Sequence, residues 1–444
     1  MIDNSEQKKA KDEIVNCVYK DRFLNTSRIK NENIFNNKNN VIKNLITQNF
    51  GGLSEVWGSA INEVEGKEKS IYKNLGIELD PYFKILNEKL NFLSNEKNSS
   101  NNTTKFPADP HLKNYYKLGE KNKKININFS RFLVSKDIRY EEEICEICGS
   151  FTFLCKNESL WSTKKEFKKF ISSNKIKYLR NHQLLSFKEN EKGVECSIQY
   201  QEKNLNLNFD YVFIGAGAFA TSEIFLKSNL IDKVVIENSD AISIPFVKKT
   251  NVKKNRTSHP LLFLHHEIDE NLFFSQIYFY SDNLLKIFLG NSILTNLLSY
   301  VPTLIKNFFG GARIFLDPKL SSKIELKYSD GKVSKKIIES EKSNFKSAFN
   351  KHLKTYKSIG FYSLKILSKK LSNGESYHFG SQFKHSNNSG KEYSDRLGRV
   401  GGLKKIHVID SSVLPIVNTG PITYTVMANS LRISDEFLNI LNSK

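Results

Sequence analysis

The residue best suited to proton transfer is His378, which lies in the segment SYHFGSQF. A general base needs a titratable nitrogen on a rigid turn beside the reacting carbon. His378 is the only histidine of the chain that is followed at once by a glycine-containing turn. A hydrogen-bonded structural histidine is the alternative interpretation.

Two glycine-containing segments could bring the backbone close to a nucleotide or a flavin. The first, NFGGLSEVWGSAI, spans residues 49–61 and is equally compatible with a plain turn. The second, YVFIGAGAFATSEIFLKSNLIDKVVIEN, reads as a strand, a turn Gly215-Ala216-Gly217, a helix and a strand that reaches Glu237. In a dinucleotide fingerprint such glycines approach a pyrophosphate, and the acid binds a ribose hydroxyl. A strand-to-helix turn without a ligand is the alternative.

Two groups of residues contain metal-binding side chains, but neither forms a full ligand set. Cys145, Cys148 and Cys155 form C-x2-C-x6-C without a fourth cysteine nearby, whereas zinc needs four ligands and iron–sulfur clusters normally need four cysteines. His265 and His266 are neighbours in an alternating apolar segment, so they should face opposite sides of a strand. We therefore expect free thiols and no metal ion.

The elements that must position these residues are clearest over residues 176–217, where short alternating strands precede the apolar run 211–214. This pattern predicts a β-meander that leads into a buried strand, a glycine turn and a helix from about Thr221. Residues 240–370 mix strands with helices and predict an α+β substrate domain. The pattern also predicts helix over 67–93, a loop at 95–105, strands at 124–128 and 130–135, and a strand, turn and helix over 405–440.

The composition bears on partners and compartment. The formal net charge is +20, but the lysines are spread along the chain among asparagines, so we expect no nucleic-acid partner. The first residues lack the apolar region of a signal peptide, and the five cysteines fit reduced thiols, so we expect a cytoplasmic protein. The most apolar stretch, residues 283–316, is interrupted by charged and amide residues, which argues against a membrane span but leaves peripheral association open.

Read together and in order, these segments resemble the glucose–methanol–choline oxidoreductases, especially bacterial members near polysaccharide biosynthesis. GGLSEVWGSAI is similar to the flavin-contacting loop of that family, and DYVFIGAGAFATSEIFLKS to its second glycine-rich strand–turn–helix. SYHFGSQF resembles the segment with the catalytic histidine, and GGARIFLDPKLSSKIEL resembles the sugar-linked subgroup. The closing signature is matched by DRLGRVGGLKKIHVIDSSVLPIVNTGPITYTVMANSLRIS. The resemblance covers roughly residues 40–440.

The resemblance implies an α/β composite fold with two parts. An incomplete Rossmann-like FAD-binding domain with a β-meander would comprise residues 40–62, 131–236 and 385–444. An α+β substrate domain would comprise residues 63–130 and 237–384.

The resemblance also implies FAD as cofactor and oxidation of a CH–OH group of a sugar or polyol. His378 would take the hydroxyl proton while hydride passes to the flavin. Asp410 would hold ribityl or phosphate oxygens, and the helix start near Thr423 would stabilise the reduced flavin. The remaining flavin-contacting positions would be Gly51, Gly52, Ser54, Trp57, Gly58, Gly215, Ala216, Gly217, Pro421 and Ile422.

The chain departs from the family pattern at three places. The fifty residues before Gly51 lack the G-x-G-x-x-G unit that binds the ADP half of FAD. Pro421 replaces a usual second catalytic residue, so Thr423 or a water would act instead. Phe151 interrupts a four-cysteine run.

Two further hypotheses therefore stand beside the enzyme. One is a truncated non-catalytic remnant, or one chain of a split flavoprotein with an upstream-encoded FAD-binding partner. The other is an NAD(P)-dependent dehydrogenase that uses the Gly215 turn.

Overall fold

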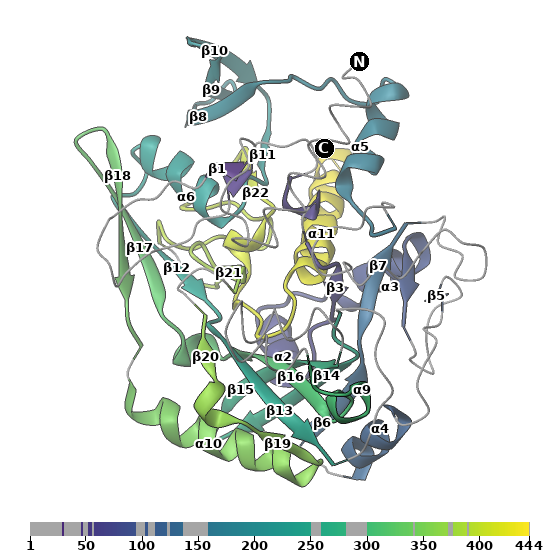
Figure 1. Cartoon of the computed structure of the whole chain (residues 1–444). Helices are drawn as coiled ribbons and strands as arrows, with labels where there is room; N and C mark the ends of the chain where they lie inside the picture. Colours follow the sequence, from purple (N-terminus) through teal and green to yellow (C-terminus); the bar gives the residue numbers. More distant parts are fainter. Residues whose placement is uncertain are drawn as a thin grey trace.

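The computed structural model describes residues 29–30, 46–47, 52–55, 57–94, 103–104, 112–121, 125–135, 159–249, 259–280, 300–340, 342–371, 376–388 and 390–443. These residues form one large antiparallel sheet, several smaller sheets and a long C-terminal helix (Figure 1). The α/β composite predicted from the sequence is confirmed.

The largest sheet lies in the lower half of the molecule in Figure 1. Its strand order is β19-β13-β16-β15-β14-β6, and β20 also pairs with β13. Helix α10 (Lys342–Ser358) and helix α4 (Leu112–Lys121) cover one face, where alternate strand residues form the main apolar core. The strands are β6 (Ile125–Phe129), β13 (Ala241–Lys248), β14 (Leu262–Ile268), β15 (Asn271–Phe279), β16 (Phe309–Leu316), β19 (Phe361–Ser363) and β20 (Lys369–Lys370).

The opposite face of this sheet has a different character, and we call it the inner face. Phe263, Phe274 and Phe315 project from it and form a second apolar cluster with Ala241 and Leu371. Because strand side chains alternate, these residues point away from α10. The inner face therefore remains available to the loops that precede the C-terminal helix.

A second core forms around helix α6 (Ala218–Lys227), which begins three residues earlier than the sequence pattern predicts. On one side, strand β11 (Val212–Ile214) pairs in parallel with β22 (Ile406–Val408). On the other, an antiparallel sheet has the order β18-β17-β12-β21. Its strands are β12 (Lys233–Asn238), β17 (Lys323–Ser329), β18 (Lys332–Ile338) and β21 (Phe379–Gly380).

The position of β12 rules against the dinucleotide interpretation of the Gly215 turn. In a dinucleotide-binding unit the strand after the helix lies parallel to the strand before it in one sheet. Here β12 belongs to a different sheet from β11 and pairs only with antiparallel neighbours. Glu237, the expected ribose ligand, instead forms ion pairs with Lys323 and Lys384 at 3.5 and 3.1 Å.

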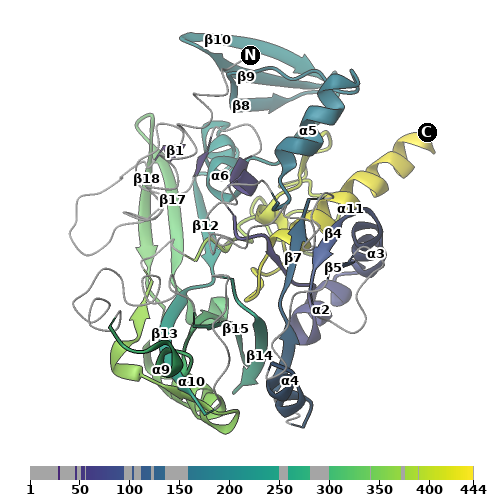
Figure 2. The same cartoon turned by 45° about the vertical axis from the view of Figure 1, so that its right-hand side comes forward.

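The predicted β-meander is present. Strands β8 (His182–Glu189), β9 (Val194–Tyr200) and β10 (Lys203–Phe209) form an antiparallel sheet in the order β10-β9-β8. Figure 2 shows this sheet at the upper end of the molecule, beside helix α5 (Thr163–Ser172). The chain then enters β11 and the Gly215 turn, as the sequence pattern predicts.

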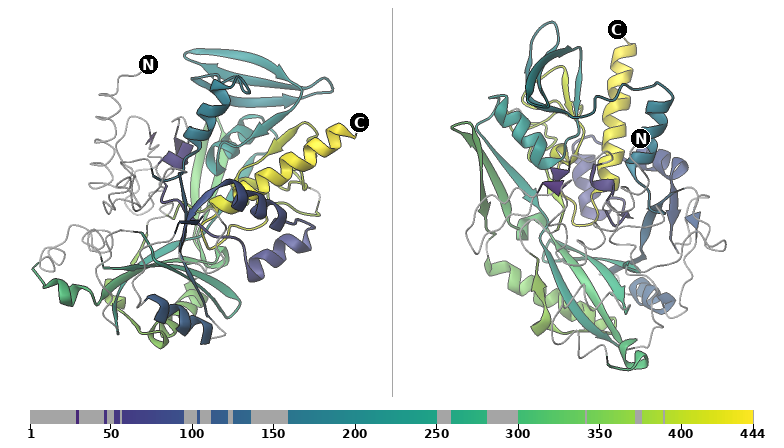
Figure 3. Two further views of the ribbon diagram at one scale, coloured as in Figure 1. Left: turned by 90° about the vertical axis from the view of Figure 1, so that its right-hand side faces the viewer. Right: turned by 45° about the horizontal axis from the view of Figure 1, so that its top comes forward.

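The segment predicted as helix over residues 67–93 divides into two helices and a strand. Helix α2 (Gly66–Asn74) ends before Gly76, whose φ of +69° is left-handed, and Pro81 lies in the first turn of α3 (Asp80–Lys89). These helices pack against the C-terminal helix α11 (Thr423–Asn442), which runs from the centre of the molecule to its surface (Figure 3). The adjoining sheet contains β3 (Ala60–Ile61), β4 (Asn91–Leu93), β5 (Thr103–Thr104) and β7 (Arg131–Val134).

That sheet joins residues on both sides of the predicted domain boundaries, because β7 pairs with both β3 and β4. The division into two domains stays a prediction.

The remaining elements are β1 (Ile29–Lys30), β2 (Ile46–Thr47), α9 (Thr303–Lys306) and the 3-10 helices η1 (Gly52–Glu55), η2 (Pro318–Leu320), η3 (Lys365–Leu367) and η4 (Ser411–Val413). Within the described residues, every helix is too short or too polar to cross a bilayer.

Candidate functional site

The site is centred on the carboxyl ends of the parallel strands β11 and β22. The turn Gly215-Ala216-Gly217 follows β11, and Asp410 follows β22 two residues after the strand ends. Because parallel strands end at the same edge, these two segments meet there, where α/β sheets commonly bind ligands. Gly217 has a φ of +85° and begins helix α6, so the turn needs a glycine at this position.

Asp410 joins the two strand ends through its carboxylate. One oxygen, Oδ2, accepts hydrogen bonds from the Gly217 N–H at 2.8 Å and the Thr221 hydroxyl at 2.6 Å. The other, Oδ1, accepts from the Ser412 N–H at 2.9 Å. The sequence placed Asp410 and Gly217 in one site, and the structure brings them into direct contact. In this structure, the carboxylate accepts all three of these hydrogen bonds from groups of the protein itself.

A third segment, residues 378–383, lies directly against η4. The Ser381 N–H donates to the Ser411 carbonyl at 2.9 Å, and a side chain at Gly380 would collide with that same carbonyl. Gln382 donates through Nε2 to the Ala218 carbonyl at 2.8 Å and contacts the Ser412 hydroxyl at 2.7 Å. The Gly217 turn, Asp410 and the His378 segment therefore form one connected structure.

His378 lies where this segment reaches the inner face of the large sheet. Its imidazole is buried and stacks on Phe315, with ring centroids 4.5 Å apart and an interplanar angle of 13°. The turn before it is held by β12, since the Ser376 hydroxyl donates to Asn238 at 2.7 Å and the Ser239 N–H donates to the His378 carbonyl at 3.2 Å. His378 therefore occupies the rigid turn that a general base requires.

Burial and, to a smaller extent, the positive charge of Arg313 together lower the pKa of His378 to about 3, although a hydrogen bond with the Thr419 backbone acts in the opposite direction. The imidazole is therefore neutral at pH 7 and can accept a proton. Its Nδ1 atom is buried and has no hydrogen-bond partner among the described residues. Ser381 Oγ and Gln382 Oε1 are buried and unpaired in the same way. Three unsatisfied polar atoms in one short segment indicate a site for a ligand.

The start of helix α11 completes the site. Pro421 and Ile422 are buried before the helix, and Thr423 is its first residue. The helix has no side-chain N-cap, so its first backbone N–H groups remain available to an electron-rich group. The preceding loop touches the inner face, since a Cβ at Gly420 would lie 3.5 Å from the Phe274 ring. Gly420, three residues before Thr423, and His378 therefore lie against the same sheet face.

Glu68 in helix α2 binds the loop that precedes α11. Its Oε1 accepts from both the Thr419 N–H at 2.8 Å and the Thr419 hydroxyl at 3.0 Å. Burial raises the pKa of Glu68 to about 7, the two Thr419 bonds act against that rise, and the nearby Asp317 adds to it. Thr419 in turn contacts His378, so Glu68 positions the loop that supports the proposed base.

This raised pKa makes stability depend on pH. Folded Glu68 binds its proton up to about pH 7, whereas the unfolded residue loses it near pH 4.5, so its contribution is full below pH 4.5 and is lost as pH rises through 7. We expect this loss to be about 3 kcal/mol. Glu68→Gln should match the wild-type free energy of unfolding near pH 4.5 and exceed it by about that amount at pH 8. Urea unfolding at both pH values tests this.

The exposed acid Glu202 supplies the control, since Glu202→Gln should leave the pH dependence of stability unchanged. An equal difference between the wild type and Glu68→Gln at pH 4.5 and pH 8 would contradict the prediction.

The first glycine loop has structural contacts of its own. The Ser54 hydroxyl accepts from the Thr163 N–H at 3.0 Å and so caps the start of α5. Trp57 donates through Nε1 to the Trp161 carbonyl at 3.0 Å and packs in the cluster that contains α11 residues. Gly52 is left-handed, with φ of +62°, and Gly58 follows Trp57. These contacts join the loop to the start of α5 and to Trp161, so the flavin role of Gly52, Ser54, Trp57 and Gly58 stays a prediction.

Several predicted features lie outside the described residues or away from the site. Gly51 and the cysteines Cys145, Cys148 and Cys155 are outside the described ranges. His265 lies on the inner face against Phe274, whereas His266 lies on the opposite face beside His352, so the predicted separation of this pair is confirmed. The described residues contain no cluster of metal-ligating side chains that would hold an ion.

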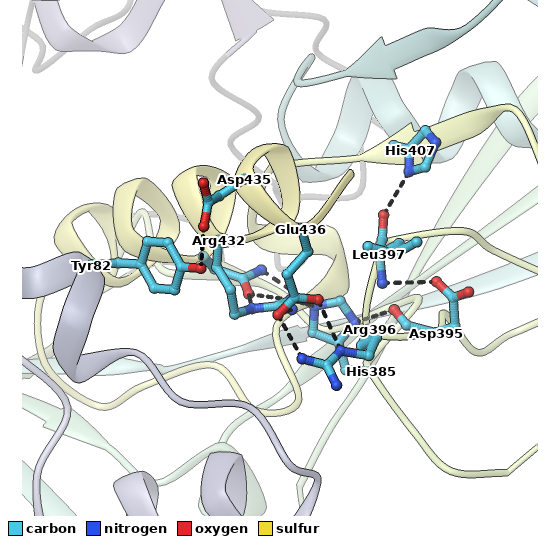
Figure 4. A network of polar contacts seen from close by, with 10 residues as sticks. Tyr82, His385, Asp395, Arg396, Leu397, His407, Arg432, Asp435 and Glu436 are labelled. Carbon is cyan, nitrogen blue, oxygen red and sulfur yellow. Dashed lines mark hydrogen bonds and ion pairs between the residues drawn. The ribbon is translucent and has the colours of Figure 1, made fainter. Parts of the chain in front are cut away.

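A polar network fixes α11 against the segment that carries the site (Figure 4). His385 donates through Nδ1 to the Asp395 carbonyl at 2.7 Å, and its Nε2 accepts from Arg432 at 3.3 Å. Arg432 also contacts Glu436 at 3.2 Å, and Glu436 binds Arg396 at 2.7 Å. Burial and, to a smaller extent, the charge of Arg432 together lower the pKa of His385 to about 3. A neutral His385 therefore connects the two segments.

The sequence analysis missed Glu68, Thr419, Gln382 and Arg313 as site residues. Glu68 and Thr419 are 351 positions apart, so no local pattern links them. Arg313 was visible only as a charge that interrupts an apolar stretch. That interruption is the one available signal, because a charge at a half-buried strand position is unfavourable without a partner.

Comparisons with known proteins show the fold. No protein-family model and no curated protein sequence matches the chain. Among solved structures, it is similar to pyridoxine 4-oxidase from Mesorbium loti, with a TM-score of 0.61 and 11% identity over 93% of this chain and 88% of that one. It is also similar to an FAD-dependent oxidoreductase from Chaetomium thermophilum, with a TM-score of 0.56 and 12% identity over 94% and 89% of the two chains. The chain therefore shares the fold of these oxidoreductases.

Proposed function

We propose that the chain is an FAD-dependent oxidoreductase that oxidises a CH–OH group of a sugar or polyol-like substrate. The observation that carries this proposal is the convergence of four segments: the Gly217 turn, Asp410, the His378 turn and the start of α11. A shared fold with oxidoreductases supports the same class. The sugar or polyol comes from the sequence resemblance.

The described residues fit a flavin at this site. The segment 378–382 contains the unpaired buried atoms His378 Nδ1, Ser381 Oγ and Gln382 Oε1. The uncapped start of α11 supplies N–H donors and a positive dipole end, and Gly217 has no heavy atom within 4 Å of a Cβ position. Backbone donors and open space beside a glycine are what a large anionic cofactor needs. Bound FAD would supply the acceptor for the substrate's hydride.

The chain's own groups would then act on the alcohol. His378, neutral and held on Phe315, accepts the hydroxyl proton at a ring nitrogen. The cluster of Phe263, Phe274 and Phe315 on the inner face would exclude water from the reacting carbon. Thr423, at the first position of α11, is the nearest hydroxyl on that helix to replace the residue that Pro421 cannot supply. Glu68 and Thr419 keep this loop in place against His378.

Asp410→Ala tests the cofactor site. Removing the carboxylate leaves the Gly217 N–H, the Thr221 hydroxyl and the Ser412 N–H without their acceptor, which should cost about 3 kcal/mol of stability. Because the turn beside the flavin then loosens, we expect FAD affinity to fall at least about tenfold. The visible absorption of FAD that remains after dialysis measures retention in each variant.

A second aspartate provides the matched control. Asp395 also accepts backbone N–H groups, from Leu397 at 2.9 Å and Arg399 at 3.0 Å, but it lies in the network of Figure 4. Asp395→Ala should lower stability while FAD retention stays near the wild-type value. Equal retention by the wild type and Asp410→Ala would place the cofactor elsewhere.

A split flavoprotein is the second candidate, and one observation favours it. Among the described residues, β11 has a strand neighbour on one side only. A partner chain that adds a strand there would complete the parallel sheet. Flavin bound only after co-expression with an upstream-encoded chain would support this candidate. Flavin bound by the chain alone would support the single-chain enzyme, and no flavin in either case would support a non-catalytic remnant.

A further inference from the structure

One row of directly opposed residues on the inner face carries positive charge. Ser243 in β13 is opposite Arg313 in β16, and Arg313 is opposite Gln276 in β15. On the other side, Lys369 in β20 is opposite Ser243. Directly opposed residues of antiparallel strands project from the same face with Cβ atoms about 5 Å apart. We call Lys369, Ser243, Arg313 and Gln276 the basic row.

The basic row lies next to the proposed reaction centre. Arg313 and Phe315 are two residues apart in β16, so their side chains share a face and lie about 7 Å apart along the strand. His378 stacks on Phe315, and the charge of Arg313 reaches it strongly enough to lower its pKa. A sugar-sized molecule that presents a hydroxyl to His378 is therefore long enough to reach Arg313 in the basic row.

Two buried polar atoms of the basic row have no hydrogen-bond partner in the described part of the chain. Arg313 Nε and Ser243 Oγ are buried and have no hydrogen-bond partner among the described residues. Gln276 accepts from the Tyr278 hydroxyl through Oε1 at 2.8 Å, which leaves its amide NH2 as a donor. In the described part of the chain, neither Arg313 nor Lys369 forms an ion pair with a carboxylate. Two cations and two neutral donors beside one another, without an acid, are complementary to an oxyanion.

We propose that the basic row is a substrate subsite that binds an anionic group, so that the alcohol oxidised at His378 belongs to an acidic sugar or polyol. This inference rests on the proposed function, which supplies the oxidation of an alcohol. The basic row supplies the reason to expect a negative charge on the substrate. A carboxylate and a phosphate ester both present the oxygens that the Arg313 fork binds in pairs. An anion there also offsets the charge of Arg313, the smaller of the two causes that lower the pKa of His378.

The test compares ligands that differ only in charge. Purified full-length chain, incubated with FAD, is titrated with D-glucose, D-glucuronate and D-glucose 6-phosphate by calorimetry. We expect at least one of the two anions to bind about tenfold or more tightly than glucose, and the better anion identifies carboxylate or phosphate as the natural group. Inorganic phosphate alone probes the anion subsite without a sugar.

Substitutions then assign the effect to Arg313. Arg313→Gln should abolish the preference for the anion, and Arg313→Lys, which keeps the charge but loses the fork, should retain part of it. Lys369→Gln should weaken the anion two- to fivefold, because this lysine is exposed. Arg180→Gln removes an equal charge from an exposed position outside the sheet and should leave the preference unchanged. Circular dichroism verifies that each variant folds.

Binding is read without turnover, so this inference and the proposed oxidation fail separately. Equal binding of glucose and both anions, or no saturable binding of any anion including phosphate, would overturn the subsite. An unchanged preference for the anion in folded Arg313→Gln would also overturn the subsite. Loss of FAD binding in that variant would overturn it as well, because the basic row would then bind the cofactor. If anion binding depends on Arg313 but the substrate does not reduce the flavin, the anion subsite is supported and the proposed oxidation is contradicted.

Discussion

His378→Ala should slow the reduction of bound FAD by its best substrate about 10²- to 10⁴-fold, while FAD itself stays bound. That range is what a positioned general base contributes to a proton transfer. The physical basis is the rigid placement of the imidazole, stacked on Phe315 at 4.5 Å and supported by a turn that β12 holds. Removing it leaves the alcohol proton without an acceptor. Anaerobic stopped-flow absorbance of the flavin, with a panel of sugars and polyols, measures the rate.

The same sheet offers a matched control on its other face. His352 stacks on Phe273 with centroids 4.7 Å apart and an angle of 14°, almost the geometry of His378 on Phe315. Because successive strand residues point to opposite faces, this second stack lies against α10 and away from the site. His352→Phe should lower stability but leave the rate of flavin reduction unchanged. A rate in His378→Ala close to that of the wild type would show that another group is the base.

Arg432→Met should lower the free energy of unfolding by about 3 kcal/mol, the lower end of the range for removing one partner of a buried ion pair. The Arg432 side chain is only 1% exposed and contacts Glu436, Asn429 and His385. Its removal leaves Asn429 Oδ1 buried without a donor and leaves His385 Nε2 with the Asn429 amide alone. Since the network joins α11 to the segment that carries the site, the helix start should loosen as well. Urea unfolding followed by circular dichroism measures the change.

Glu436 provides an internal comparison, because two arginines bind it. Arg396 contacts the same carboxylate at 2.7 Å, but its side chain is 61% exposed. An exposed ion pair is screened by water and contributes less than about 1 kcal/mol. Arg396→Met should therefore cost far less than Arg432→Met. An equal loss in the free energy of unfolding in the two variants would mean that burial does not decide how much each arginine stabilises the protein.

Many local features of this protein follow from its sequence alone. The apolar run before Gly215 predicts strand β11, the alternation before it predicts the meander, and both are present. These successes share a physical reason: periodicity and turn chemistry act over a few neighbouring residues, so a local pattern is enough to predict them.

The tertiary structure decided which strands become neighbours. A strand–turn–helix–strand pattern is compatible with a dinucleotide unit, yet β12 leaves β11 and pairs antiparallel with β17 and β21. Sequence periodicity gives a strand its two faces but not its partner, which depends on burial against distant segments. The same reason explains the helix prediction over residues 67–93, where the left-handed Gly76 and Pro81 divide the segment.

The composition of the candidate site also depends on long-range packing. His378 and Asp410 could be chosen from their local motifs. Glu68, Thr419 and the basic row could not, because their contacts join α2 to the α11 loop and four strands to one another. The sequence by itself determined the strands, the turns and the candidate base. Only the tertiary structure placed an unpaired Arg313 beside that base, because strand register, which decides which side chains share a row, is fixed when the whole sheet packs.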